Sequence, residues 1–314
     1  MVADARLGKD AKGAYWMYAT ARTRRQKRSR CALMWARGGK KMFDCELVGK
    51  VGSMALIDKR RNALSYDTVA RISQDLRPGD IWVTSGAVEV GRLDYIKRNG
   101  CEIEGDDESV KTDYSAQGQT VLMNTYRQFI DPKFSVRQIL VEHQHFNDPE
   151  KREHLHALLT RSMKQGAIPI INYNDAVSCE ETRNLEIRNL KAKSAHVVQC
   201  VDNDETASQI ACLMKAETLL IMTSTEGIYL DSKDKSTLVP VIGGKDIEEL
   251  IKNVEYHQTL CEGASRKGAN GAFAKLEYIK EPLKNGTTVI IGSSSYTIRE
   301  LLSGVAPRTI IKTN

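Results

Sequence analysis

Two lysines beside glycine turns are the residues of this chain best suited to chemistry. The first lies in Gly49-Lys50-Val51-Gly52-Ser53, and the second ends Gly268-Ala269-Asn270-Gly271-Ala272-Phe273-Ala274-Lys275. Each places a cation next to glycine-rich backbone that can approach a phosphate closely. Neither segment has the G-x-x-x-x-G-K-[ST] spacing of a Walker A loop. A nucleotide, if bound, must therefore be held by another fold.

Three polar clusters between the lysines offer complementary groups. The Ser85-Gly86 turn exposes backbone amides and a hydroxyl suited to a carboxylate or phosphoryl group, or is simply a serine helix cap. The segment Asn172-Tyr173-Asn174-Asp175 has the donors and the anionic acceptor that an α-amino acid needs, although Asx-rich turns are often only structural. Asp202-Asn203-Asp204 is either a strong N-cap or a centre that orients lysines, a metal or a substrate amine.

Together, these lysines, carboxylates and glycine-rich turns predict phosphoryl transfer, in which the protein positions groups and neutralises charge. An acceptor carboxylate is already anionic at neutral pH, so no general base is required. Nucleophilic catalysis fits poorly because no histidine lies near a G-x-S-x-G elbow.

A metal hypothesis rests on His143 and His145 of a predicted strand and His154 and His156 of the next helix. The second pair points to different sides of that helix, so we predict no protein metal site.

The elements that must position these residues alternate between short apolar runs and amphipathic segments. This order predicts a three-layer αβα sandwich with a mainly parallel central sheet. In such a sheet, ligands bind beyond the carboxyl ends of the strands. The predicted strands are Glu46–Lys50, Asp80–Thr84, Gln138–Val141, Ile168–Asn172, Leu219–Met222 and Thr288–Ile291.

Helix signals support this layout. Asp148-Pro149-Glu150 should open a helix that runs to about Lys164. Thr297 to Glu300 forms a capping box, and Gly304 should end that helix. Two further helices should open at Asp204 and at Gly271. We find no internal repeat after residue 42 and expect one compact domain of two lobes over residues 42–314.

Charge divides the chain unevenly. Residues 1–41 carry 12 Lys or Arg residues and two Asp residues, so the remainder of the +6 chain is mildly acidic. We therefore do not expect a nucleic-acid binder. The basic stretch at residues 22–30 fits a disordered tail, an Arg-rich presequence, sequence upstream of a natural start at Met42, or a binding arm for nucleic acid or a partner.

Composition and patterning also indicate the compartment. Seven scattered cysteines without a C-x-x-C pair argue for reduced thiols and against a disulfide framework or structural zinc. We find neither a membrane-spanning apolar run nor a secretory signal core, and so expect a soluble, cytoplasmic protein that does not bind membranes.

The order and identity of the motifs resemble the glutamate 5-kinases, a group within the amino acid kinase family. Their members phosphorylate the γ-carboxylate of glutamate in proline synthesis. The resemblance begins near Cys45 and excludes the RNA-binding-like C-terminal domain of many members, since the chain stops soon after Leu302. It rests on Lys50–Ser53, Ser85–Ala87, Ala116–Gln119, Ile168–Asn172, Asn174–Val177, Asp202–Asp204, Thr223 with Glu226–Tyr229, and the glycine loop ending at Lys275.

This resemblance implies roles for individual residues. Lys50 and Lys275 would stabilise the transferring phosphoryl group from either side, and Asp204 would orient them. The glutamate site would consist of Ser85, Gly86, Asp175 and Asn203, within an N-terminal half that reaches to about residue 205. The nucleotide would lie on the C-terminal half, with Mg²⁺ bridging its phosphates. The residues that contact ATP would be Lys50, Gly52, Ser53, Thr223, Ser224, Tyr229, Ala269, Asn270, Gly271 and Lys275. A homo-oligomer acting on a small molecule is also implied.

Several positions depart from the family pattern. Ser224 and Asn270 stand where the family has an aspartate and a glycine, and Tyr173 replaces a glutamate. The segment between Asp175 and Asp202 is longer than the family's short loop and carries the basic run Arg183 to Lys193. Such a loop would border the acceptor site. Two alternatives therefore stay open: another small anionic acceptor, such as a different amino acid, carbamate, phosphate or phosphonate, or a non-catalytic nucleotide-binding member.

Overall fold

The computed structural model describes residues 6–9, 15–18, 43–194, 197–200, 202–231, 233–261 and 271–314. The chain divides into two compact units, Met1–Lys41 and Met42–Asn314. In the first unit, β1 (Arg6–Lys9) pairs with β2 (Tyr15–Tyr18) in antiparallel orientation. The basic stretch at residues 22–30 lies outside the described residues.

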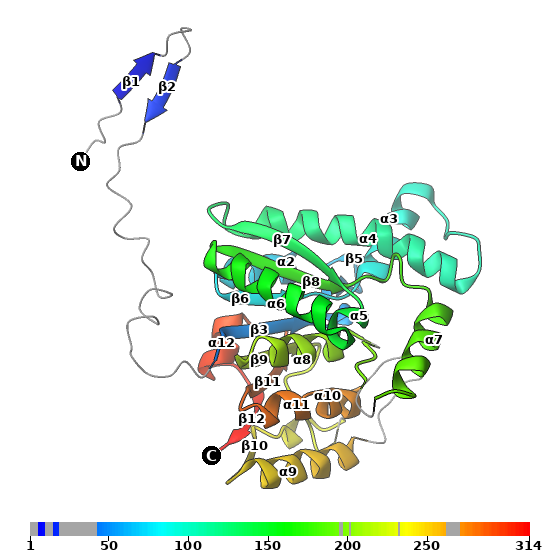
Figure 1. The fold of residues 1–314 in the computed structure, drawn as a ribbon, viewed down its shortest axis with the longest axis vertical. Helices are drawn as coiled ribbons and strands as arrows, with labels where there is room; N and C mark the ends of the chain where they lie inside the picture. The colour runs from blue at the N-terminus through cyan, green and yellow to red at the C-terminus, as the bar shows by residue number, and fades with distance from the viewer. Residues whose placement is uncertain are drawn as a thin grey trace. The chain divides into compact units, whose positions relative to one another are not determined.

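A mainly parallel sheet of eight strands organises the second unit (Figure 1). The strand order is β10-β12-β11-β9-β3-β6-β8-β7, and of these pairs only β11 with β12 is antiparallel. The strands are β3 (Cys45–Val51), β6 (Asp80–Val83), β7 (Ser135–Val141), β8 (Ala167–Tyr173), β9 (Ala216–Thr223), β10 (Val241–Gly244), β11 (Thr288–Ser293) and β12 (Arg308–Thr313). All six predicted strands are confirmed, whereas β10 and β12 were not predicted. A separate hairpin joins β4 (Ile57–Asp58) to β5 (Ala63–Leu64).

Helices cover both faces of this sheet (Figure 1). They are α2 (Tyr66–Asp75), α3 (Ala87–Asn99), α4 (Asp107–Phe129), α5 (Gln144–Asn147), α6 (Pro149–Lys164), α7 (Glu180–Lys191), α8 (Asn203–Leu213), α9 (Ile247–Leu260), α10 (Ala272–Tyr278), α11 (Lys280–Lys284) and α12 (Ile298–Ser303). Short 3₁₀ turns lie at Ser53–Leu56 and Lys235–Thr237.

Alternating strand residues divide the core into two apolar layers. Val48 and Val83 face one layer with α6, α8 and α9, whereas Leu47 and Trp82 face the other with α2, α4 and α12. Because successive strand side chains point to opposite faces, short apolar runs can serve both layers. The predicted three-layer αβα fold with a mainly parallel sheet is confirmed.

Most predicted helix starts are also confirmed. The Asp148 side chain accepts hydrogen bonds from the backbone amides of Glu150 and Lys151 at the start of α6. Thr297 and Glu300 form the predicted capping box of α12, and Gly304 ends that helix in the left-handed region.

Three local expectations were wrong. The cap of α3 is Gly86 at φ 87°, with no side-chain hydrogen bond, and not a serine. His143 and His145 do not lie on a strand, because β7 ends at Val141 and a turn leads into α5. Local hydrogen bonds favour that turn, including one from the Glu142 amide to His145 Nδ1 (3.0 Å). The segment expected to be a loop after Asp175 contains helix α7.

Candidate active site

Two lysines and one carboxylate form the centre of the candidate site. Lys50 lies on the central strand β3, Asp204 in the first turn of α8, and Lys275 on α10. Lys50 Nζ is 2.6 Å from Asp204 Oδ1, and Lys275 Nζ is 3.0 Å from Asp204 Oδ2. Each carboxylate oxygen therefore holds one ammonium group, so that the two cations are fixed on either side of a single anion.

This centre is largely removed from water. The side chains of Lys50 and Asp204 are 6% and 5% exposed, and that of Lys275 is 18% exposed. Burial alone would raise the pKa of Asp204, but the two ammonium groups outweigh it and hold the pKa below its ordinary value. The carboxylate stays ionised, and the three groups together carry one net positive charge.

Two glycine-containing turns, one after β3 and one after β6, meet beside Lys50. The Gly52 amide donates to the Met222 carbonyl of the neighbouring strand (3.0 Å), and a Cβ placed on Gly52 would lie 3.8 Å from Lys50 Nζ. A Cβ on Gly86 would lie 3.5 Å from the Cα of Ser53, so the turns after β3 and β6 touch. At φ 87°, Gly86 also adopts backbone geometry that other residues rarely accept. The predicted residues Gly52, Ser53, Ser85 and Gly86 are therefore neighbours in space.

A network of side-chain amides connects α4 and β8 to this centre. Asn203 Nδ2 donates to Asn172 Oδ1 (2.9 Å), and Asn172 Nδ2 donates to Gln119 Oε1 (2.8 Å). The Tyr173 amide donates to Asn203 Oδ1 (3.2 Å). The network joins α4, β8 and α8, and it fixes Asn203 one residue before Asp204. Gln119 Nε2 is buried, and its two N–H donors have no hydrogen-bond partner in the described residues.

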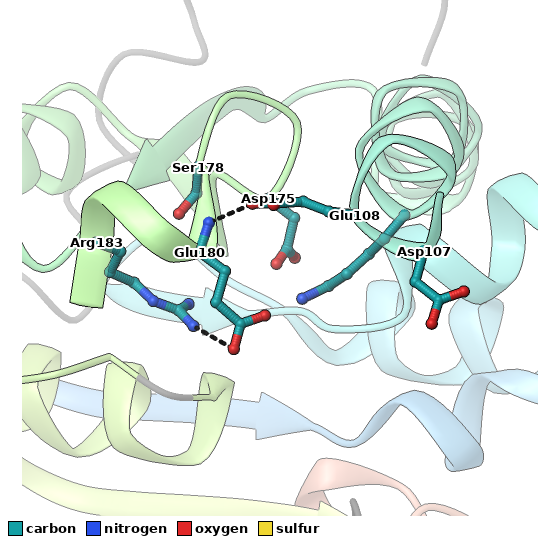
Figure 2. A pocket seen from close by; sticks show the side chains of 7 residues that line it. Asp107, Glu108, Asp175, Ser178, Glu180 and Arg183 are labelled. Carbon is teal, nitrogen blue, oxygen red and sulfur yellow. Dashed lines mark hydrogen bonds and ion pairs between the residues drawn. The ribbon is translucent and has the colours of Figure 1, made fainter. Parts of the chain in front are cut away.

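Three polar residues at and after the end of β8 lie in different surroundings. Asn172 joins the amide network, whereas Asn174 Nδ2 donates to Glu142 Oε1 (2.9 Å). Asp175 lines a separate cavity of about 180 Å³, shown in Figure 2, together with residues of α4 and α7. Burial raises the pKa of Asp175, and the charges of Lys111 and Arg183 offset part of that rise.

Residues predicted to bind ATP lie in different surroundings. Thr223 ends β9 next to β3, and its hydroxyl accepts the Thr225 amide (2.9 Å). Ser224 is exposed, and the Tyr229 hydroxyl donates to Glu226 Oε2 (3.1 Å). Gly271 precedes α10, so it lies within one turn of Lys275. Ala269 and Asn270 lie outside the described residues.

Sequence reasoning gave no role to several residues that the structure places at the site. Gln119 lies in a quoted motif, Ala116 to Gln119, and Asn172 in a quoted strand end, so both signals were available. Lys111 was overlooked because a single exposed lysine in a helix has no distinctive pattern. Arg183 was noted only as part of a basic run, but it lines the cavity with Asp175.

The fold is shared with kinases of known structure. Carbamate kinase from Giardia lamblia bound to AMP-PNP superposes with a TM-score of 0.53 at 12% identity, over 87% of this chain and 99% of that chain. An isopentenyl phosphate kinase in a substrate complex gives a TM-score of 0.50 at 11% identity, over 85% of this chain and all of that chain. The model of the amino acid kinase family matches residues 46–293, and the chain belongs to that family.

Within the family, the sequence resembles glutamate 5-kinases. The enzyme from Thermosynechococcus vestitus is 27% identical over 83% of this chain and 67% of its own length. The enzyme from Streptococcus suis is 28% identical over 81% of this chain and 66% of its own length. The chain thus spans about two thirds of these relatives, whereas its match to the Clostridium perfringens enzyme, at 25% identity, covers 82% of this chain and 91% of that protein.

Proposed function

We propose that this protein catalyses the ATP-dependent phosphorylation of the γ-carboxylate of L-glutamate, which gives glutamyl 5-phosphate for proline synthesis. The observation that carries the proposal is the buried Asp204 carboxylate between Lys50 and Lys275. Relatives named glutamate 5-kinase support the choice of acceptor.

The proposed reaction needs electrostatic stabilisation more than proton transfer. The glutamate carboxylate attacks the γ-phosphorus of ATP, the bond to the β-phosphate oxygen breaks, and ADP leaves. Negative charge spreads over the equatorial oxygens in the transition state. Lys50 and Lys275 would neutralise that charge, while Asp204 keeps both ammonium groups in place and so reduces the cost of ordering them.

We infer that the nucleotide is held in the C-terminal half and the acceptor in the N-terminal half. Thr223, Ser224, Tyr229 and Gly271 follow α8 in the sequence, as does Lys275. No side chain at Gly52 fills the space beside Lys50 Nζ, where a Cβ would lie 3.8 Å from the nitrogen, and we propose that a phosphate approaches the backbone there. Ser85, Gly86 and Asn203 would approach the acceptor from the opposite side.

Magnesium would be held mainly by the phosphates of ATP. In the described part of the chain, no three His, Cys, Asp or Glu side chains lie close enough together to hold an ion. Mg²⁺ commonly keeps several waters and binds through substrate phosphates with one or two carboxylates, and we propose that mode here. When bound, it would neutralise charge on the β- and γ-phosphates.

Charge in the Asp175 cavity favours an amino acid over the alternative acceptors. Its lining includes four carboxylates and two cations, so a purely anionic phosphate or phosphonate would meet net repulsion. An amino acid has an ammonium group for the carboxylates and a carboxylate for the cations. We therefore prefer glutamate to carbamate, phosphate or phosphonate.

The test is an acceptor panel with purified protein, ATP and Mg²⁺. ADP release and trapping of the acyl phosphate with hydroxylamine should both respond to L-glutamate. The comparison acids are aspartate, carbamate, phosphate and a phosphonate, each against an enzyme-free blank. Turnover with another acid but none with glutamate would contradict the proposed acceptor, and ATP binding without turnover of any acid would indicate a non-catalytic member.

A further inference from the structure

The cavity beside Asp175 is formed by two helices that approach each other at their N-terminal ends. Asp107, Glu108 and Lys111 come from the first turns of α4, whereas Glu180 and Arg183 come from α7. Asp175 lies on the segment between β8 and α7, and Figure 2 shows its carboxylate directed into the space between the two helices. Residues 72 positions apart, Lys111 and Arg183, thus line one small volume.

Two charged groups of this cavity, those of Asp175 and Lys111, remain available to a ligand. Within the described residues, the Asp175 carboxylate and the Lys111 ammonium make no hydrogen bond or ion pair. Arg183 reaches Glu180 only at 4.0 Å, the outer limit of an ion pair, although its side chain is just 15% exposed. Its guanidinium also lies 5.9 Å from the ring centroid of Tyr173, which restricts its orientation. A half-buried anion and two nearby cations with weak or absent partners are suited to a zwitterion.

We propose that Arg183 and Lys111 bind the α-carboxylate of the amino acid acceptor, while Asp175 binds its α-ammonium group. This inference rests on the proposed function and adds two residues that determine acceptor specificity. Arg183 contributes most because a guanidinium can form two parallel hydrogen bonds with a carboxylate. Helix α7 is then the element that distinguishes an α-amino acid from a simple carboxylic acid.

The contacts of α7 are consistent with a fixed wall of the site. The Glu180 amide at its start donates to a carboxylate oxygen of Glu108 on α4. In its middle, Glu186 Oε2 lies 2.9 Å from Nε2 of the buried His143. These two contacts hold α7 against α4 and against the end of β7. Arg183 lies between them along the helix, so its position is set by the protein before a ligand arrives.

Two analogues of glutamate separate the proposed contacts. 4-Aminobutyrate keeps the γ-carboxylate and the ammonium group but lacks the α-carboxylate, whereas glutarate keeps both carboxylates and lacks the ammonium group. We expect Arg183→Gln to lower kcat/KM for glutamate about tenfold or more, mainly through KM, and to leave the value for 4-aminobutyrate unchanged. The preference for glutamate over 4-aminobutyrate should fall by the same factor. Lys111→Gln should act in the same direction but less, because Lys111 is exposed.

The control is Arg188→Gln, an exposed arginine on the same helix that lies outside the cavity lining. It should change neither kcat/KM nor the preference. Arg183→Lys should recover part of the preference, because it restores the charge without the paired geometry. Thermal unfolding of each variant shows whether α7 has kept its packing.

Equal losses for glutamate and 4-aminobutyrate in Arg183→Gln, or no loss for glutamate, would overturn the inference. Failure of the proposed function looks different, because the unsubstituted protein would then fail to turn over glutamate. An unchanged preference in an active enzyme therefore rejects only the role of Arg183 and Lys111.

Discussion

The lysine centre and the Asp175 cavity differ in how their charged groups are paired. At the centre, Asp204 contacts both lysines and all three side chains are at least four-fifths buried. In the cavity, Asp175 has two cations nearby but no hydrogen bond or ion pair within the described residues. Asp204 holds both lysines of the centre before substrates bind, whereas the Asp175 carboxylate has no such partner in the described residues.

Their supports differ in the same way. Lys50 lies on β3, which has neighbouring strands on both sides, and its register places it beside Val83 and Ile221. The cavity lies between the ends of two helices. Lys50, to which we assign a role on the transferring phosphoryl group, thus lies in the middle of the sheet. The groups proposed to choose the acceptor lie at the ends of helices, where sequence can vary with less effect on the fold.

The largest expected effect is at the centre. Lys50→Ala or Lys275→Ala should lower kcat by about 10²–10³-fold because each removes a preorganised cation from the transition state. The fold should persist, since Asp204 keeps the other lysine as partner. Steady-state kinetics with thermal unfolding tests this. Lys280→Ala, at a lysine paired with Glu277, is the matched control; unchanged turnover in both test variants would remove the role assigned to them.

Asp204→Asn tests whether the balance of the centre depends on charge. This substitution leaves two buried ammonium groups close together without their shared anion. The free energy of unfolding should fall by about 3 kcal/mol, and kcat should fall as well. Chemical denaturation measures the first quantity. An unchanged free energy of unfolding would contradict the expectation that the Asp204 charge stabilises the two buried lysines.

Asp175→Asn should show the opposite pattern at the cavity. The carboxylate makes no ion pair in the described structure, so little stability should be lost. The KM for glutamate should rise about tenfold or more with kcat little changed, because a charged hydrogen bond to the ammonium group disappears. Asp113→Asn, at an exposed residue of α4 outside the cavity lining, is the control and should have a small effect. A loss mainly in kcat would place Asp175 with the lysine centre.

The smallest expected effect is a change in stability with pH at His143, which contacts Glu186 of α7. Burial lowers the pKa of His143, although Glu186 and Glu142 oppose the shift, and Arg183 adds to it. Because its pKa in the folded state lies below the unfolded value near 6.5, unfolding takes up protons as pH falls. The free energy of unfolding should therefore decrease by less than about 1 kcal/mol between about pH 7 and pH 5. His143→Gln should flatten that slope in denaturation curves; an unchanged slope would contradict the role of His143.

Local patterns predicted much of the fold. Apolar runs predicted six strands that neighbour one another in the sheet, from β11 to β7. Asp148 and Thr297 marked helix starts because their side chains satisfy free backbone amides. The short, glycine-containing β10 gave little signal. For α7, Glu180 and Glu181 in its first turn and Arg188 and Lys191 in its last match the helix dipole. That signal was present but was interpreted as a basic loop.

Among the described residues, no helix is long and apolar enough to cross a membrane. Neither that observation nor the family assignment tests the expected homo-oligomer or the expected cytoplasmic location, so both stay predictions.

The sequence by itself predicted the residues to which we assign the reaction and most of the elements that carry them, because glycine turns, caps and apolar periodicity act over a few neighbouring positions. Only the tertiary structure decided which distant groups meet. Lys50 and Asp204 are 154 positions apart and lie 2.6 Å from each other, because the packing of α8 against the sheet brings them together. Likewise, Arg183 joins Lys111 and Asp175 because α7 packs at the end of α4. Such distances follow from burial of the whole core, and no local pattern in the sequence records them.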